Sequence, residues 1–214
     1  MHRMTSMRRP ARKAPSPSLQ VSRPLTIGLT GGIAAGKSTA LAAFERLGAA
    51  TISSDAVVHE LLESEPLLPR LVERWGRMVA PAGKVDRDRI GSIVFADPNE
   101  LKWLEGQIHP LVGERIGTWL TSLPDEADIA VVEVPLLFEA GMDGAFDTTV
   151  AIVTSDEVRG ERARARGHAL VDEREARQLA QAEKASRAAH VIENDGSVED
   201  LERELSALVE KLCA

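Results

Sequence analysis

The sequence predicts an α/β protein in which helices flank a parallel β-sheet. Short apolar runs rich in β-branched residues alternate with amphipathic helical stretches along most of the 214 residues. Such alternation is typical of parallel strands joined by crossover helices. A glycine-rich turn over Gly31–Ser38 joins the first strand to the first helix. The nearly continuous apolar run Ile129–Val134 is typical of a strand that is buried on both faces.

Apolar periodicity and turn signals place the elements in order. The predicted strands are Leu25–Thr30, Ala49–Ser53, Ile129–Val134, Thr148–Val153 and His190–Ile192. A helix is expected to begin at Pro98, to be interrupted by His109-Pro110 because proline removes a backbone donor, and to continue over Val112–Leu120. The other predicted helices are Lys37–Leu47, Asp55–Glu63, Leu67–Trp75, Arg87–Phe95, Asp156–Arg166, Asp172–Ala188 and a C-terminal helix from Gly196-Ser197 to Leu212.

The composition excludes several classes of protein. A single cysteine, Cys213, excludes a disulfide framework and a cysteine-built metal site, and it favours a reducing, cytoplasmic compartment. The net charge of −7 argues against a general nucleic-acid binder. No apolar run approaches the roughly 18 residues that span a bilayer, so no membrane partner is expected. The oligomeric state is not fixed by these features, and a monomer is favoured.

The first 23 residues differ in composition from the remainder. They are rich in proline, serine and arginine and contain no acid. This pattern predicts a disordered tail, with an organelle transit peptide as the alternative. The Arg8-Arg9 pair is not followed by the apolar core of an export signal. One folded domain is therefore expected over residues 24–214.

The segment Gly31-Gly32-Ile33-Ala34-Ala35-Gly36-Lys37-Ser38 fits the pattern G-x-x-x-x-G-K-[ST] of the P-loop. Glycines let backbone N–H groups turn inward around a phosphate, and the following helix points its positive end at the same place. Lys37 would reach the β- and γ-phosphates of a nucleotide, and the Ser38 hydroxyl would bind Mg²⁺. The alternative is an ordinary glycine turn before a helix. The motif predicts a P-loop NTPase-type sheet that binds ATP and Mg²⁺.

Two acidic residues follow predicted strands at the edge where a parallel sheet binds ligands. Asp55 could accept a proton from an attacking hydroxyl, or it could cap the helix that begins there. Glu133 resembles the carboxylate that lies near the metal in P-loop proteins, but it could equally be a structural buried acid. Pro135 ends its strand because it has no N–H to donate.

Arginines are concentrated in one late segment. Arg159, Arg162 and Arg166 recur at i, i+3 and i+7, so they share one helix face, and further arginines follow at positions 174, 177 and 187. Such a group could neutralise charge during phosphoryl transfer from a mobile lid, or it could be a solvated face paired with neighbouring glutamates. His109 is either structural or functional, and the three tryptophans are expected to be packing residues.

Together these motifs resemble the dephospho-coenzyme A kinase family over nearly all of the expected domain. The residues that carry the resemblance are the block Ile27–Ile33 with Gly36-Lys37-Ser38-Thr39, Asp55, Asp86-Arg87 with Ile93-Val94-Phe95, His109-Pro110, the string Val134-Pro135-Leu136-Leu137-Phe138-Glu139, Arg162, Arg166, Gln178, Lys184, Asn194 and Gly196-Ser197. The sequence departs from the family pattern at His59, usually Arg, at Ala189, commonly Asp, at Ser53-Ser54, and at Glu133, often Asp.

The resemblance implies that ATP phosphorylates the ribose 3′-hydroxyl of dephospho-coenzyme A, the last step of coenzyme A synthesis. It implies a nucleotide-binding core at about 25–54 and 129–214, a helical substrate-binding region at about 55–120 and an arginine-rich lid at about 162–187. It makes Asp55, Lys37 and Arg162 catalytic and Ser38 a metal ligand. The implied ATP-binding residues are Gly31, Gly32, Ala34, Ala35, Gly36, Lys37, Ser38, Thr39, Arg162, Arg166 and Asn194, the last beside adenine. The implied acceptor-binding residues are Asp55, His59, Arg87, His109 and Pro135.

Two other functions are compatible with a P-loop. Another small-molecule kinase, acting on a nucleoside, a nucleotide or a sugar acid, would share the nucleotide chemistry and differ in the helical region. A GTPase-like regulator is disfavoured because no Asn-Lys-x-Asp string that reads guanine occurs.

Overall fold

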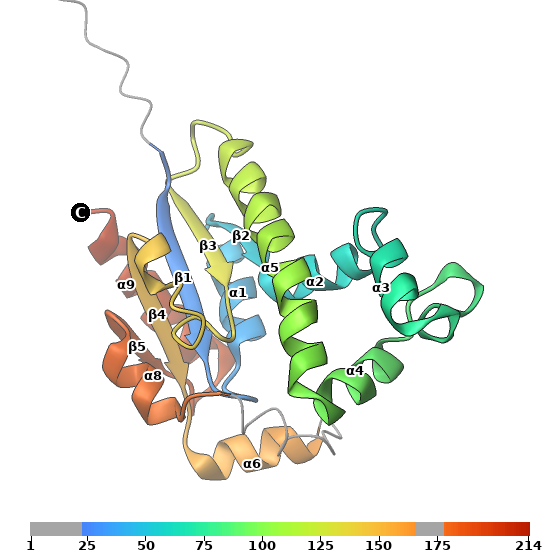
Figure 1. Ribbon diagram of the computed structural model, residues 1–214. Helices are drawn as coiled ribbons and strands as arrows, with labels where there is room; N and C mark the ends of the chain where they lie inside the picture. Colours follow the sequence, from blue (N-terminus) through green and yellow to red (C-terminus); the bar gives the residue numbers. More distant parts are fainter. Residues whose placement is uncertain (1–22, 166–177) are drawn as a thin grey trace, which may run out of the picture.

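The computed structural model, which describes residues 23–165 and 178–214, is an α/β fold built on one parallel sheet (Figure 1). The sheet has the strand order β2-β3-β1-β4-β5, and all four pairings are parallel. The predicted class and all five predicted strands are therefore confirmed. Their bounds are Leu25–Gly31 for β1, Ala50–Ser53 for β2, Ile129–Glu133 for β3, Thr148–Val153 for β4 and His190–Glu193 for β5.

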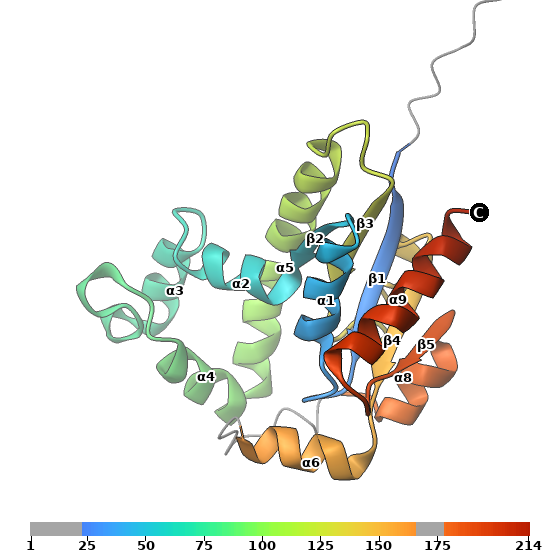
Figure 2. The same cartoon turned by 180° about the vertical axis from the view of Figure 1, so that it is seen from behind.

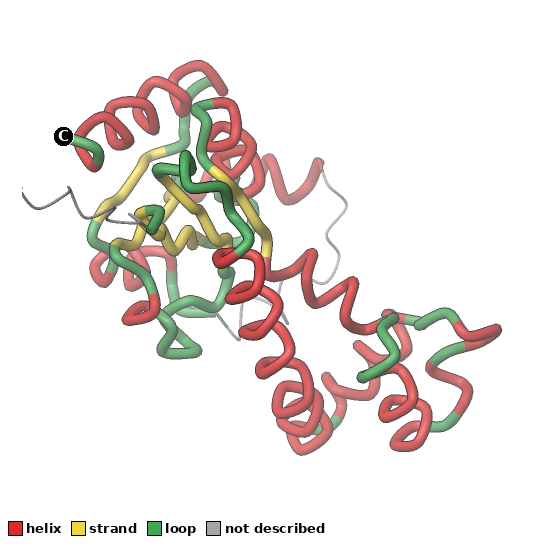
Figure 3. The backbone as a smooth tube through the Cα atoms, turned by 90° about the horizontal axis from the view of Figure 1, so that it is seen from above, coloured by secondary structure: helices red, strands yellow, loops and turns green. Residues whose placement is uncertain are grey.

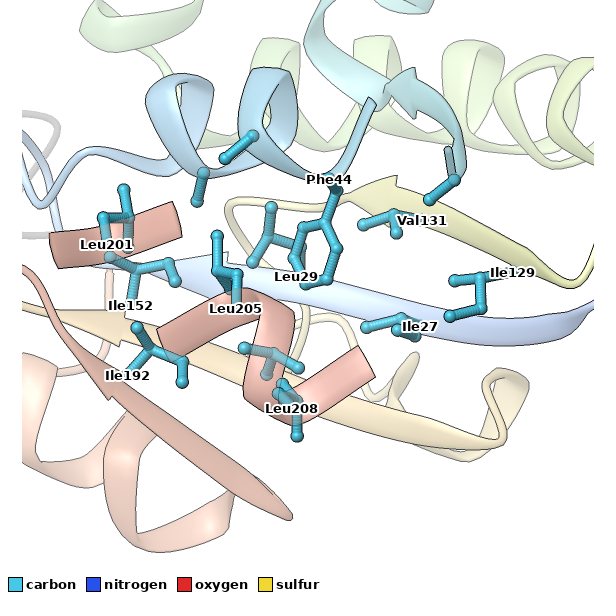
Figure 4. Close-up of a cluster of buried hydrophobic side chains, with 14 of the residues drawn as sticks. Ile27, Leu29, Phe44, Ile129, Val131, Ile152, Ile192, Leu201, Leu205 and Leu208 are labelled. Carbon is cyan, nitrogen blue, oxygen red and sulfur yellow. The ribbon is translucent and has the colours of Figure 1, made fainter. Parts of the chain in front are cut away.

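One face of the sheet is covered by helices α1 (Lys37–Arg46) and α9 (Val198–Leu212), as Figure 2 shows. Side chains alternate across a strand, so Ile27 and Leu29 of β1 point to this face. They pack against Phe44 of α1 and Leu205 of α9, and Figure 4 shows these side chains within one buried cluster. The capping box of Ser197 and Asp200 begins α9, as the Gly196-Ser197 signal predicts.

The opposite face is covered by α5 (Pro98–Thr121) and α8 (Gln181–Arg187). Gly28 lies on this face of β1, where an added Cβ would be 2.8 Å from the Phe146 ring. Glycine is thus needed in this central strand because a neighbouring side chain occupies the space. Val132, Leu137 and Phe138 continue the apolar cluster from the sheet to the helices.

Three helices extend away from the sheet, as the view from above shows (Figure 3). They are α2 (Ser54–Leu62), α3 (Leu68–Trp75) and α4 (Arg87–Ala96). Arg74 and Trp75 of α3 both donate hydrogen bonds to Glu100 in the first turn of α5. The Trp75 ring also meets Trp103 edge to face at 5.1 Å. These contacts tie α3 to α5, and both tryptophans are partly buried packing residues, as predicted.

The prediction that His109-Pro110 interrupts the long helix is wrong, because α5 runs through Pro110. The proline is exposed, whereas Ile108, Val112 and Ile116 occupy the buried face at four-residue spacing. Their packing outweighs the lost hydrogen bond. The first part of the predicted helix Asp172–Ala188, up to position 177, lies outside the described residues. In its described part the helix is α8, which begins at Gln181, later than the arginine-rich pattern suggests.

Helix α6 (Asp156–Ala165) follows β4 and lies across the carboxyl ends of the strands (Figures 1 and 2). The P-loop leaves the same edge, at the end of β1. Short 3₁₀ turns at Arg77–Val79, Pro81–Gly83 and Asp143–Ala145 connect other elements. Within the described ranges, no helix combines the length and the apolar character needed to cross a bilayer.

Candidate active site

The P-loop has the backbone shape that its sequence predicts. Gly36, immediately before α1, has a φ of 98°, and Ala34 also lies in the left-handed region with a φ of 60°. A Cβ at Gly36 would lie 2.1 Å from Asn194 Nδ2, so only glycine fits there. The Lys37 Nζ lies over the loop and donates hydrogen bonds to the Gly31 and Gly32 carbonyls at 3.1 and 3.0 Å. Helix α1 then directs its amino end toward the loop.

The loop is also held by a buried asparagine that follows the edge strand β5. Asn194, directly after β5, donates from Nδ2 to the Ala35 carbonyl at 2.8 Å. Arg162 of α6 donates in turn to the Asn194 carbonyl at 2.9 Å. The structure thus brings together three predicted nucleotide-binding positions, 35, 162 and 194. The Asn194 side chain braces the P-loop itself. Arg166, the other predicted arginine, lies outside the described residues.

Glu133 lies at the centre of the carboxyl edge, beside Leu29 of β1 and Ser53 of β2. It is buried, and burial raises the pKa of its carboxyl group, with the charge of Asp55 acting in the same direction. A hydrogen bond with Ser53 and the ammonium group of Lys37 oppose this shift. The P-loop lysine and the two predicted acids are therefore close enough to interact through their charges.

Asp55 lies in the first turn of α2, where its carboxylate is exposed. The N-cap position of this helix is occupied by Ser53, two residues earlier, so the alternative that Asp55 is the helix cap is wrong. A carboxylate in the first turn still favours the helix through its dipole. The exposed side chain is accessible to an acceptor molecule in solution.

The other predicted acceptor residues stand on separate elements. His59 lies one turn after Asp55 on α2, Arg87 begins α4, and His109 lies in the middle of α5. All three are exposed. Pro135 follows β3, and its carbonyl accepts a hydrogen bond from the Thr30 hydroxyl at 3.3 Å. Of this set, Pro135 is therefore the residue in direct contact with the strand that carries the P-loop.

Sequence reasoning missed a side chain that lies beside the P-loop and bonds to the residue after β4. Gln181 Nε2 donates to the Thr154 carbonyl at 2.7 Å, and its Oε1 accepts from the Thr154 N–H at 3.1 Å. The same oxygen would lie 3.2 Å from a Cβ at Gly32. No sequence signal marked this glutamine, because its role depends on the fold bringing α8 next to the loop.

A cavity of about 330 Å³ opens between α2 and α5. Ile52, Val57 and Trp119 are among the residues that line it, together with Glu60 and Arg115, which form an ion pair at 3.6 Å. None of the predicted site residues lines this cavity.

Comparisons with known proteins agree on one family. The sequence profile of the dephospho-CoA kinase family matches residues 25–200. A dephospho-CoA kinase of Symbiobacterium thermophilum is 39% identical over 193 residues, which cover 87% of this chain and 81% of that protein.

Two solved structures also resemble this one. The Thermus thermophilus protein TT1252 is 36% identical, with a TM-score of 0.76 over 89% of this chain and 99% of that chain. The dephospho-CoA kinase of Campylobacter jejuni is 27% identical, with a TM-score of 0.66 over 87% and 96% of the two chains. The region that the family profile matches, residues 25–200, includes both the P-loop and the three helices that extend from the sheet.

Proposed function

The chain belongs to the dephospho-CoA kinase family, and we propose that its P-loop edge transfers the γ-phosphate of ATP to the ribose 3′-hydroxyl of dephospho-CoA. It is a phosphotransferase of coenzyme A synthesis. The observation that carries the proposal is the meeting of Lys37, Glu133 and Asp55 at the carboxyl edge of the sheet. A phosphate-binding cation thereby lies near an exposed acid that can receive the acceptor.

The P-loop binds the triphosphate of ATP through its backbone N–H groups and Lys37. In the structure, the Lys37 ammonium bonds two loop carbonyls, so binding exchanges these weak partners for phosphate oxygens. Ala34, Ala35 and Thr39 complete the loop and the first turn of α1. Because Lys37 is a compact charge, it stabilises the charge that develops on the transferred phosphoryl group.

Mg²⁺ fits the same place. The exposed Ser38 hydroxyl is adjacent to Lys37 in the first turn of α1, and the Glu133 carboxylate lies near that lysine. Magnesium is usually bound by one or two protein oxygens together with substrate phosphates and water. We propose that Ser38 ligates the ion and that Glu133 supports it through water. The bound ion would supply positive charge to the β- and γ-phosphates.

Asp55 is the proposed general base, because it is an exposed acid whose charge, like that of Lys37, acts on Glu133 at the carboxyl edge of the sheet. It would orient the ribose hydroxyl and take its proton as the new P–O bond forms. Arg162, whose guanidinium lies 3.8 Å from the position of a Cβ at Gly36, is close enough to the start of α1 to stabilise the transferring phosphoryl group. His59, Arg87, His109 and Pro135 are proposed to hold the acceptor.

The function is tested by supplying the protein with ATP, Mg²⁺ and single acceptors. We expect ATP consumption with dephospho-CoA and formation of coenzyme A, and turnover at least about 100-fold slower with a nucleoside, a nucleotide or a sugar acid. Efficient turnover of one of those acceptors, with dephospho-CoA left unchanged, would instead support a different small-molecule kinase. A cytoplasmic location and a monomeric state stay predictions from composition.

A further inference from the structure

Lys184 of α8 is a buried cation with no role in the chemistry proposed above. Its side chain is fully buried, an unusual environment for lysine. The Nζ donates a hydrogen bond to the Pro135 carbonyl and forms an ion pair with Glu139 Oε1 at 3.0 Å. Both partners belong to the loop that follows β3.

The Pro135 carbonyl lies between the end of β3 and the P-loop strand. It accepts one hydrogen bond from Lys184 and a second from the Thr30 hydroxyl, and Thr30 is fully buried directly before Gly31. One residue earlier, the Val134 N–H donates to the Leu29 carbonyl at 2.8 Å. The Thr30 bond therefore continues the attachment of the loop to β1 beyond the last backbone pairing, and the Lys184 bond holds the same carbonyl from α8.

A contribution to folding stability does not explain well why Lys184 and Glu139 form an ion pair here. Burial lowers the pKa of Lys184, which means that the charged form is disfavoured, and the contact with Glu139 only partly opposes this shift. One Glu139 oxygen also accepts from the Leu179 N–H at 2.8 Å, whereas the other is buried without a hydrogen-bond partner. Apolar side chains of similar volume often stabilise a protein as well as such a buried pair does. The pair is better explained by the position that it imposes on the Pro135 carbonyl.

We propose that Lys184 is a positioning residue for phosphoryl transfer, which fixes the end of β3 against the P-loop through the Pro135 carbonyl. The inference rests on the proposed function. Lys184 is not placed in contact with ATP or the acceptor. It acts through the alignment of Glu133 and Pro135 with Gly31 and Lys37. An error of about 1 Å in such an alignment can cost on the order of 100-fold in rate.

Three variants separate positioning from charge balance. Lys184→Met removes the bond to Pro135 and leaves the half-buried Glu139 without its cation, so both the melting temperature and kcat should fall. Glu139→Gln breaks the same ion pair but keeps the bond, because even a neutral lysine donates to a carbonyl. The double variant Lys184→Met/Glu139→Gln removes both charges, so its melting temperature should recover toward that of the parent.

The kcat for dephospho-CoA decides the question, measured where circular dichroism shows each variant to be folded. We expect kcat to fall on the order of 10- to 100-fold in both variants that lack Lys184, with each KM changed less than about threefold. Glu139→Gln should keep kcat within about threefold of the parent. Lys211→Met, the same change at an exposed lysine, is the matched control.

Parent-like kcat in either variant that lacks Lys184, or equal losses in the two single variants, would overturn the inference. A parent enzyme that transfers no phosphate to dephospho-CoA would contradict the proposed function itself, and the inference with it. If the parent phosphorylates dephospho-CoA and the double variant does so with a parent-like kcat, the inference about Lys184 is overturned and the proposed function is not.

Discussion

At the scale of single residues, the P-loop illustrates which positions a sequence can specify. Gly36 and Lys37 are constrained by the local turn and by the helix that follows, so a short motif suffices to predict them. No local motif predicts the residue that bonds to the P-loop from another part of the chain. Asn194 donates to Ala35 from 159 residues away, and only its resemblance to a family pattern drew attention to it. The actual contact could not be predicted, because it depends on β5 ending beside β4.

The role of Asp55 is tested by Asp55→Asn, which keeps the shape of the side chain but cannot accept a proton. Loss of a general base costs on the order of 10²- to 10⁴-fold, so kcat for dephospho-CoA should fall at least about 100-fold. ATP binding and the melting temperature should stay close to the parent values, because Asp55 does not occupy the N-cap position of α2. Steady-state kinetics together with thermal unfolding measure both effects.

Asp88→Asn is the matched control for this substitution. Asp88 is also an exposed acid in the first turn of a helix, α4, so the two variants lose the same favourable interaction with a helix dipole. The control should keep kcat within about twofold of the parent. Equal turnover by the Asp55 and Asp88 variants would show that Asp55 is not the general base and serves only as a charge at a helix end.

At the scale of elements, the strands were easier to predict than the long helix. Buried parallel strands form continuous apolar runs, and β3 and β4 were recognised for this reason. Pro110 was expected to stop a helix because the rule is local. Helix α5 continues because Ile108 and Val112 lie on either side of it in a shared apolar cluster, and that packing is a property of the assembled fold.

The amino ends of β1 and β4 are joined by an ion pair between Arg23 and Asp147. The two terminal nitrogens of the Arg23 guanidinium each donate a hydrogen bond of 2.7 Å to the Asp147 carboxylate. The backbone N–H and the hydroxyl of Thr26 donate to the same carboxylate. These hydrogen bonds, of which the one from Arg23 has the largest effect, hold the pKa of Asp147 far below its usual range. The two ion-pair partners are 124 residues apart, so sequence patterns gave no sign of the contact.

Because the folded-state pKa of Asp147 is depressed, its stabilising effect is present above the unfolded pKa of about 3.9 and is lost as the pH falls through the folded value. We expect Asp147→Asn to lower the free energy of unfolding by about 1–2 kcal/mol at pH 7. This difference from the parent should be unchanged down to about pH 5 and should shrink progressively below about pH 4. Urea unfolding at a series of pH values measures it.

An exposed acid on a nearby turn, Asp125, serves as the control for that series. Asp125→Asn should change the free energy of unfolding by less than about 0.5 kcal/mol at every pH. A difference for Asp147→Asn that stays constant, or that grows, as the pH falls from 5 to 3 would contradict the assigned direction of the pKa shift.

At the scale of the whole molecule, the sheet separates two apolar clusters with different surroundings. The cluster under α1 and α9 is confined to the sheet and its helices, whereas the other extends into the region of α2 to α5. The predicted strand and helix alternation was sufficient for this layered plan. The helical region was placed from a family resemblance, because its short amphipathic helices do not encode their direction away from the sheet.

The P-loop connects β1 to α1 and lies beside Gln181 of α8, which covers the opposite face of the sheet, so nucleotide binding should stabilise the folded chain as a whole. A ligand at about 100 times its dissociation constant adds about 2.7 kcal/mol to the free energy of unfolding. For a domain of this size that corresponds to a rise in melting temperature of roughly 5–11 °C with Mg²⁺ and ATP.

Lys37→Met should lose most of this nucleotide-dependent rise and most of the transfer activity, because methionine keeps the length of lysine but not its charge. Without nucleotide, the variant should melt within a few degrees of the parent. Chelating the metal with EDTA should reduce the rise in the parent if Ser38 and Mg²⁺ act together. An equal nucleotide-dependent rise in the parent and in Lys37→Met would place ATP elsewhere on the molecule.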